Sequence, residues 1–123
     1  MSTNPVQGMW ERFQARDWEG AAELIHEDFV GEWPNTAERM EGRDNFLAVQ
    51  RAYPEGWTIE VRRIVAEGDQ VAVEVRVPHG DELFHCAGFY EVREGKVLRA
   101  TEYWSDGVPG EAPTWRAEWI QPL

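Results

Sequence analysis

The sequence predicts an α+β domain in which a curved antiparallel or mixed sheet wraps around three N-terminal helices, leaving a cone with an open end. Apolar residues recur at helical spacing up to Tyr53, and the period changes to two from Trp57 onward. One apolar stripe per helix and one apolar face per strand are buried when the helices pack on the sheet. The 123 residues fit a single domain, 1–123, with a core at about 5–106 and an irregular tail at 107–123.

Three helices are expected in the N-terminal part of the chain. Asn4 and Pro5 are typical of a helix start, and Asp17 is expected to cap a second, short helix that ends near residues 26–28. A third helix is expected to follow Gly42 and to end at Pro54. The apolar stripes of the first and third helices are Val6, Met9, Trp10 and Phe13, and Phe46, Val49, Gln50 and Tyr53.

One short strand, 29–33, is expected between the second and third helices. Pro34 stops it because proline cannot donate to a strand ladder, and residues 35–41 are expected to form a polar loop. Four antiparallel strands are expected after the third helix, the first at 57–67 with a bulge near 62–65. In the next strand, 70–77, one face consists of Val71, Val73, Val75 and Val77.

The last two strands are expected to form a hairpin around Glu94-Gly95, and the second arm ends at Trp104. Alternation places Leu98, Ala100, Glu102 and Trp104 on one face of that arm, and Val97, Arg99, Thr101 and Tyr103 on the other. Neither face is purely apolar, so the pattern leaves open which face is buried. After Trp104 the tail is expected to be anchored by Trp115 and Trp119.

Composition and charge exclude several partners. The formal net charge of −11 argues against nucleic acid and anionic membranes, which both require a positive surface. No apolar run approaches the ~18 residues that a membrane span needs, and residues 1–5 lack the features of a secretory signal, so a cytoplasmic location is expected. The single cysteine, Cys86, excludes an internal disulfide and is read as a small buried hydrophobe rather than a nucleophile.

No cofactor or metal is expected. The chain contains no phosphate-binding loop, nucleophile elbow or dinucleotide fingerprint. Its three histidines are dispersed and have no tight spacing to acidic residues, which gives no metal-binding signature.

Glu102 is the first candidate catalytic residue. A carboxyl group flanked on its own face by Ala100 and Trp104 would lose hydration, and its pKa would rise toward the range of general acid/base chemistry. The alternative is the opposite strand parity, or an ion pair with Arg63, Arg76 or Arg99 across the sheet.

Two further residues are weighed as partners of Glu102. Glu32 on the short strand is either a second acid in the same pocket or a solubilising charge on an edge strand. His85 is either a proton shuttle or a surface histidine. The aromatic residues that we expect to wall a pocket for an apolar small molecule, or else to belong to the core, are Trp10, Phe13, Trp33, Tyr53, Tyr90 and Trp104.

The order of elements and several motifs resemble the nuclear transport factor 2-like superfamily, in its SnoaL-like and ketosteroid-isomerase-like branch. The motifs are residues 28–30 before a strand that ends at Pro34, residues 41–44 at the start of the third helix, and residues 92–97 leading to 101–106. The resemblance covers about residues 5–106 and implies a cone-shaped α+β barrel with an apolar pocket and a homodimer formed through the outer sheet face.

Residue by residue, the resemblance argues against two activities of this superfamily. Trp33 stands where ketosteroid isomerases have an aspartate base, and Trp10 or Phe13 where they have a tyrosine. Their second acid falls near residues 86–88, where this chain has none. Of the three catalytic residues of limonene epoxide hydrolases, only the last-strand acid is matched, by Glu102.

Three functions remain open from the sequence. The first is a cofactor-free SnoaL-like isomerase, cyclase or hydrolase that uses Glu102 as acid and base on an apolar substrate, a role similar to that of the last-strand acid in SnoaL-like cyclases. The second is a non-catalytic domain that binds a ligand in the same pocket. The third is an interaction module whose exposed sheet face binds a protein.

Overall fold

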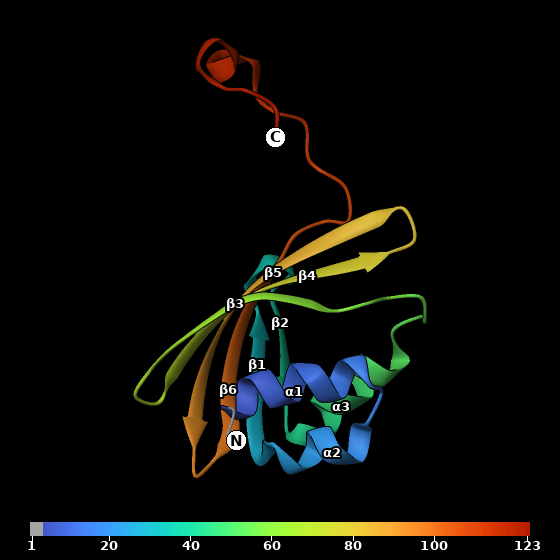
Figure 1. Ribbon diagram of the computed structural model, residues 1–123, viewed down its shortest axis with the longest axis vertical. Coiled ribbons are helices and arrows are strands. Elements are labelled where there is room, and N and C mark those ends of the chain that lie inside the picture. The colour runs from blue at the N-terminus through green and yellow to red at the C-terminus, as the bar shows by residue number, and fades with distance from the viewer. Residues whose placement is uncertain (1–3) are drawn as a thin grey trace.

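The computed structural model describes residues 4–123 and contains three α-helices packed against one curved, mixed sheet (Figure 1). The sheet order is β2-β1-β6-β5-β4-β3, and the sheet does not close into a barrel. The helices are α1 (Pro5–Gln14), α2 (Trp18–Glu23) and α3 (Arg43–Ala52), with short 3-10 helices η1 (Pro34–Thr36) and η2 (Thr114–Trp119). The strands are β1 (Ile25–Trp33), β2 (Glu38–Glu41), β3 (Glu60–Glu67), β4 (Gln70–His79), β5 (Glu82–Arg93) and β6 (Lys96–Trp104).

This architecture confirms the predicted fold class. The prediction that residues 1–5 are not a secretory signal concerns residues 1–3 in part, and these lie outside the described residues. Among the described helices, none combines the length and the hydropathy that crossing a bilayer requires.

The helix starts follow the predicted local signals. The Asn4 side chain accepts a hydrogen bond from the Gln7 backbone N–H at 2.9 Å, and Asp17 accepts one from Gly20 N–H at 2.9 Å. These caps satisfy backbone donors that the first turn of a helix leaves unpaired. The predicted stripe of α1 is buried against the core: Val6, Met9, Trp10 and Phe13.

Two boundaries around β1 differ from the prediction. α2 ends at Glu23, and β1 already begins at Ile25, where the helix was expected to continue. The expected loop 35–41 contains η1 and the edge strand β2, which pairs antiparallel with the end of β1. Only Met40 of β2 is buried, so this strand has no apolar alternation by which the sequence could reveal it.

The sheet is mixed because β1 pairs in parallel with β6, with Gly31 opposite Ala100 and Glu32 opposite Thr101. The remaining pairs are antiparallel. The predicted inner face of β4 is confirmed, since Val71, Val73, Val75 and Val77 are all buried. The predicted bulge in β3 is also present, as a register shift between Val61 and Arg63.

A second bulge lies in the last hairpin. The turn at Glu94-Gly95 has positive φ at both residues, 55° and 77°, as a tight two-residue hairpin turn requires. The pairing of Val92 with Val97 is followed by that of Glu91 with Arg99, which leaves Leu98 as the extra residue on β6. Val97 is therefore buried, whereas strict alternation grouped it with the opposite face.

The tail after β6 leaves the body of the domain as an extended segment (Figure 1). Apart from η2, this tail has no regular secondary structure. Trp115 and Trp119 are 74% and 71% exposed, so the expectation that they anchor the tail is wrong. The indole rings find no apolar surface because the tail extends away from the core.

Candidate functional site

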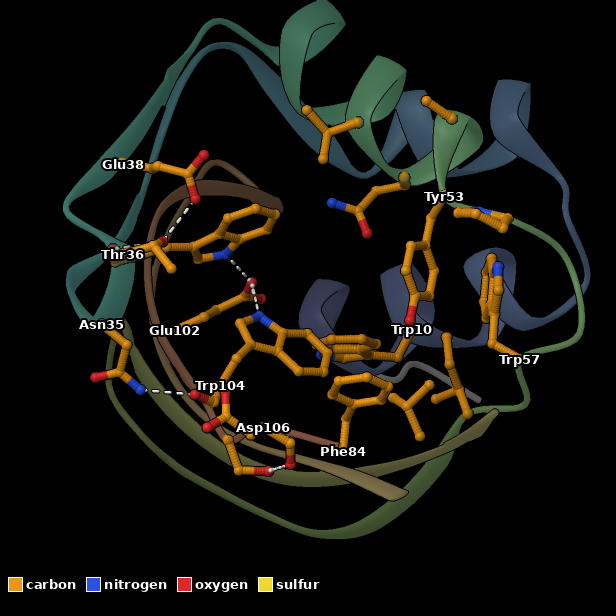
Figure 2. Close-up of a pocket in the computed structure, with 18 residues that line it drawn as sticks. Trp10, Asn35, Thr36, Glu38, Tyr53, Trp57, Phe84, Glu102, Trp104 and Asp106 are labelled. Carbon is orange, nitrogen blue, oxygen red and sulfur yellow. Dashed lines mark hydrogen bonds between the residues drawn. The ribbon is translucent and has the colours of Figure 1, made fainter. Parts of the chain in front are cut away.

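A cavity of about 920 Å³ lies between the helices and the inner face of the sheet, at the end of β6 (Figure 2). Aromatic and aliphatic side chains make up most of its wall. The lining residues are Trp10, Trp33, Asn35, Thr36, Glu38, Val49, Gln50, Ala52, Tyr53, Pro54, Trp57, Ile59, Val77, Phe84, Glu102, Trp104, Ser105 and Asp106. This volume is in the range of sites that bind small organic molecules.

Glu102 is the charged residue buried in this wall, with 2% of its surface exposed. Its Oε1 accepts hydrogen bonds from the indole N–H groups of Trp33, at 2.9 Å, and Trp104, at 3.3 Å. Figure 2 shows Glu102 and Trp104 side by side at the end of β6, with their side chains directed toward the cavity. The strand parity that the sequence left open is thus settled, with Glu102 on the inner face.

Tyr90 donates the third hydrogen bond to Glu102, from its hydroxyl to Oε2 at 2.5 Å. Tyr90 lies on β5 and is itself buried. The residue that pairs directly with Glu102 on β5 is Gly88. A Cβ at Gly88 would overlap the Tyr90 ring and hydroxyl, so the glycine makes the space in which the phenol crosses over to the carboxyl group.

Burial dominates the electrostatics of this cluster. It raises the pKa of Glu102 above the usual 4.5, although the hydrogen bonds from Tyr90, Trp33 and Trp104 act in the opposite direction. The pKa of Tyr90 lies well above its usual value of 10.0, because of burial and the neighbouring Glu102 charge. Burial likewise raises the pKa of the Cys86 thiol, which agrees with a structural role for this cysteine.

Glu102 has no cationic partner among residues 4–123. The arginines weighed as partners form other ion pairs: Arg63 with Glu74 at 2.8 Å, Arg76 with Glu60 at 2.7 Å and Arg99 with Glu91 at 3.8 Å. The alternative in which Glu102 forms an ion pair across the sheet is therefore wrong. No group of three or more metal-ligating side chains within the described residues is placed to hold a metal ion.

The structure separates Glu32 and His85 from Glu102. Glu32 points away from the cavity, is about half exposed and pairs with Arg39 at 3.3 Å. Its neighbour Trp33 takes the inward position because successive residues of a strand point to opposite faces. His85 is exposed on the outer face of β5, where it pairs with Arg76 of β4. Neither residue reaches the cavity, which corrects the expectation that they assist Glu102.

Most of the aromatic residues expected at the pocket lie there. Trp10, Trp33, Tyr53 and Trp104 line the cavity, and Tyr90 contacts it only through Glu102. The expectation that Phe13 lines the pocket is wrong. Phe13 is packed in the core between Trp10, Trp18 and Phe46 and does not belong to the cavity wall.

Sequence reasoning did not find several lining residues. For Phe84 the sequence does contain a signal, because Phe84 has the same strand parity as Cys86, Gly88 and Tyr90 and so points to the same face of β5. Trp57 precedes β3 and is held by the guanidinium of Arg16, which lies 3.3 Å from the centre of its ring. The residues from η1 and β2, Asn35, Thr36 and Glu38, lie in the segment that was expected to be a loop.

The curved sheet, the helices packed against it and the aromatic cavity beside Glu102 define an α+β fold with a cavity of a size that can hold a small molecule. The SnoaL-like domain family matches residues 6–100. The chain therefore belongs to the SnoaL-like family. No curated protein matches it significantly.

Solved structures agree with this assignment. A protein from Kribbella flavida DSM 17836, described as a candidate ketosteroid isomerase, is 33% identical with a TM-score of 0.89, over 97% of this chain and 87% of that one. An NTF2-like protein of unknown function from Burkholderia xenovorans LB400 is 31% identical with a TM-score of 0.79, over 97% and 92%. IdmH from Streptomyces antibioticus, described as a candidate polyketide cyclase, is 23% identical with a TM-score of 0.72, over 81% and 88%, and shares the fold.

Proposed function

We propose that this protein is a cofactor-free enzyme that moves a proton on an apolar small molecule held in the cavity, with Glu102 as the acid and base. The observation that carries the proposal is the buried Glu102 carboxyl group in the wall of an otherwise largely apolar cavity. Burial raises its pKa toward the pH range in which a carboxyl group both accepts and returns a proton.

The hydrogen bonds to Glu102 define which of its positions is free to react. A carboxylate offers about four acceptor positions on its two oxygens. Trp33 and Trp104 occupy Oε1, and Tyr90 occupies one position on Oε2. The remaining position on Oε2 is where a substrate proton would be taken up and from which it would be returned, which gives isomerisation without any added reagent.

Tyr90, Trp33 and Trp104 are positioning residues in this proposal. Their three donors hold the carboxylate in one orientation and favour its ionised form, which accepts the proton. Trp33 stands where ketosteroid isomerases carry an aspartate, and it supplies an indole N–H in place of a base. The proposed chemistry therefore rests on one carboxyl group, and the relative described as a candidate ketosteroid isomerase does not fix the substrate.

The proposal is tested with a panel of cyclic ketones and epoxides incubated with the protein in D₂O. NMR detects deuterium that enters next to the carbonyl group, and mass spectrometry detects hydrolysis or rearrangement. Glu102→Gln is expected to abolish any turnover, and Glu32→Gln, which changes an exposed carboxyl on the other face, is expected to preserve it. Equal turnover by Glu102→Gln and the wild type would overturn the proposal.

A non-catalytic ligand-binding domain is the second candidate. The same cavity supports it, because binding needs only the aromatic wall. Ligand binding without turnover of any panel compound by the wild type would favour this second function.

We also infer that the protein is a homodimer, as its resemblance to the superfamily implies, and we propose a cytoplasmic location for it. Phe89 and Tyr103 support the dimer, because they stack edge to face on the exposed side of β5 and β6. Exposed aromatic pairs are typical of interfaces. Light scattering after size exclusion measures the mass, and Phe89→Ser is expected to shift a dimer toward the monomer.

A further inference from the structure

The charges around the cavity are of one sign. Among the residues that the structure describes, three carboxyl groups belong to its lining, Glu38, Glu102 and Asp106, and no lysine, arginine or histidine does. None of the three forms an ion pair within residues 4–123. Arg16 contacts the lining only through the ring of Trp57, and its charge is paired with Glu55 at 2.9 Å.

Glu102 is the buried one of these three groups, whereas Glu38 and Asp106 are exposed. All three of its hydrogen-bond partners donate to it, and all three are neutral. Three donors and no acceptor match an ionised carboxylate, which accepts only. Buried carboxylates in proteins are ordinarily paired with a cation. Residues 4–123 supply none here, so the place of the counter-ion is left to a ligand in the cavity.

The wall around this position is also suited to a cation. Trp33 and Trp104 contact Glu102 through their indole N–H groups. The other aromatic residues of the lining are Trp10, Tyr53, Trp57 and Phe84 (Figure 2). The faces of aromatic rings carry negative potential and attract organic ammonium groups, most strongly in a desolvated site. The net charge of −11 adds a field that concentrates cations and repels anions at the opening.

We propose that the ligand of this cavity is an organic amine in its ammonium form, with an apolar body that fills the aromatic part and an ammonium group that pairs with the Glu102 carboxyl group. This inference rests on the proposed small-molecule site and names the class of compound that the site takes. It also predicts that carboxylates and phosphates of the same shape are excluded.

Three adamantane compounds with one rigid body test the proposal: 1-aminoadamantane, 1-hydroxyadamantane and adamantane-1-carboxylate. Affinity is measured by calorimetry and by tryptophan fluorescence at pH 7. We expect the amine to bind at least about tenfold more tightly than the alcohol, a 1.4 kcal/mol difference, and the carboxylate to bind most weakly. Equal or tighter binding of the alcohol or the carboxylate, or no binding of the amine, would overturn the proposal.

Variants then locate the charge that selects the amine. Glu102→Gln is expected to reduce the preference for amine over alcohol to near one, while the matched control Glu32→Gln retains it. If Glu102→Gln does not fold, the double variant Glu38→Gln and Asp106→Asn is expected to lower the preference in part, and an unchanged preference would count against the proposal. The ligand series is independent of turnover, so its failure is distinguishable from a failure of acid/base catalysis.

Discussion

The indole N–H of Trp33 donates to Glu102 Oε1 at 2.9 Å, and this bond joins residues 69 positions apart in the chain. The contact exists because β1 and β6 pair in parallel and bring the end of β1 beside the end of β6. Two elements that the sequence presents as unrelated thus meet at the one buried carboxyl group of the cavity.

Trp33→Phe keeps an aromatic ring in the cavity wall and removes this donor. We expect the pKa of Glu102 to rise further, because the indole hydrogen bond lowers it in the native protein. We also expect a loss of about 1–3 kcal/mol in the free energy of unfolding. Carbon NMR of the carboxyl group and urea titration measure the two effects. Trp119→Phe, at an exposed position of the tail, is the control and is expected to change neither quantity.

Tyr90→Phe removes a hydroxyl that donates to Glu102 at 2.5 Å and changes little else in side-chain volume. A hydrogen bond to a charged group contributes about 1.5–3 kcal/mol, so a loss of this size is expected in urea unfolding. The pKa of Glu102 should rise as well. Tyr103→Phe, on the exposed outer face, serves as the comparison. A Tyr90→Phe protein as stable as Tyr103→Phe would show that this hydrogen bond contributes nothing.

Gly88→Ala tests whether the glycine makes room for Tyr90. Its new Cβ would overlap the phenol, so Tyr90 must move away from Glu102. We expect a destabilisation of about 1–3 kcal/mol from overpacking, together with a change in the fluorescence of the neighbouring tryptophans. Gly110→Ala is the matched control, since its Cβ would meet no atom within 4 Å. Similar unfolding curves for both variants would contradict this explanation.

The pH dependence of stability follows from the raised pKa of Glu102. The folded protein binds the Glu102 proton more tightly than the unfolded chain does. The stabilisation that this proton provides is therefore fully present below pH 4.5, and it is lost as the pH rises from 4.5 to the pKa of Glu102 in the folded protein. Tyr90 and Cys86, which face Glu102, keep their protons throughout this range. The wild type minus Glu102→Gln difference in unfolding free energy should therefore fall across this window. A flat difference would show that Glu102 titrates normally.

Deleting residues 108–123 is expected to leave the stability of the domain unchanged within about 0.5 kcal/mol, because the removed tryptophans are exposed. The truncation keeps Gly107, whose carbonyl accepts a hydrogen bond from Leu83 N–H at 2.8 Å. Urea unfolding at two protein concentrations provides the measurement. A clear loss of stability that depends on concentration would show that the tail packs against a second copy of the chain.

Local sequence signals determined the elements whose causes are local. Asn4 and Asp17 cap helices through side chains three residues from the backbone groups they satisfy. The alternation from Val71 to Val77 indicates the inner face of β4, because the burial of each valine is favourable whichever residue packs against it. The sequence also singled out Glu102 as an acid among apolar residues of the same parity, and it left open whether that face is buried.

Tertiary structure decided which residues surround that acid, and the bulge at Leu98 is the physical reason. An unbroken hairpin continuing from the pairing of Arg93 with Lys96 would set Glu102 opposite Ala87, on the face that carries His85. The one extra residue sets it opposite Gly88 instead, on the face of Tyr90. Trp33 lies next to Glu102 because β1 pairs in parallel with β6, which is distant in the sequence. The residues of a short strand do not indicate which distant strand it pairs with. The sequence by itself therefore determined the α+β fold and named Glu102 as the candidate acid, and the register of the folded sheet determined the burial of Glu102 and its partners.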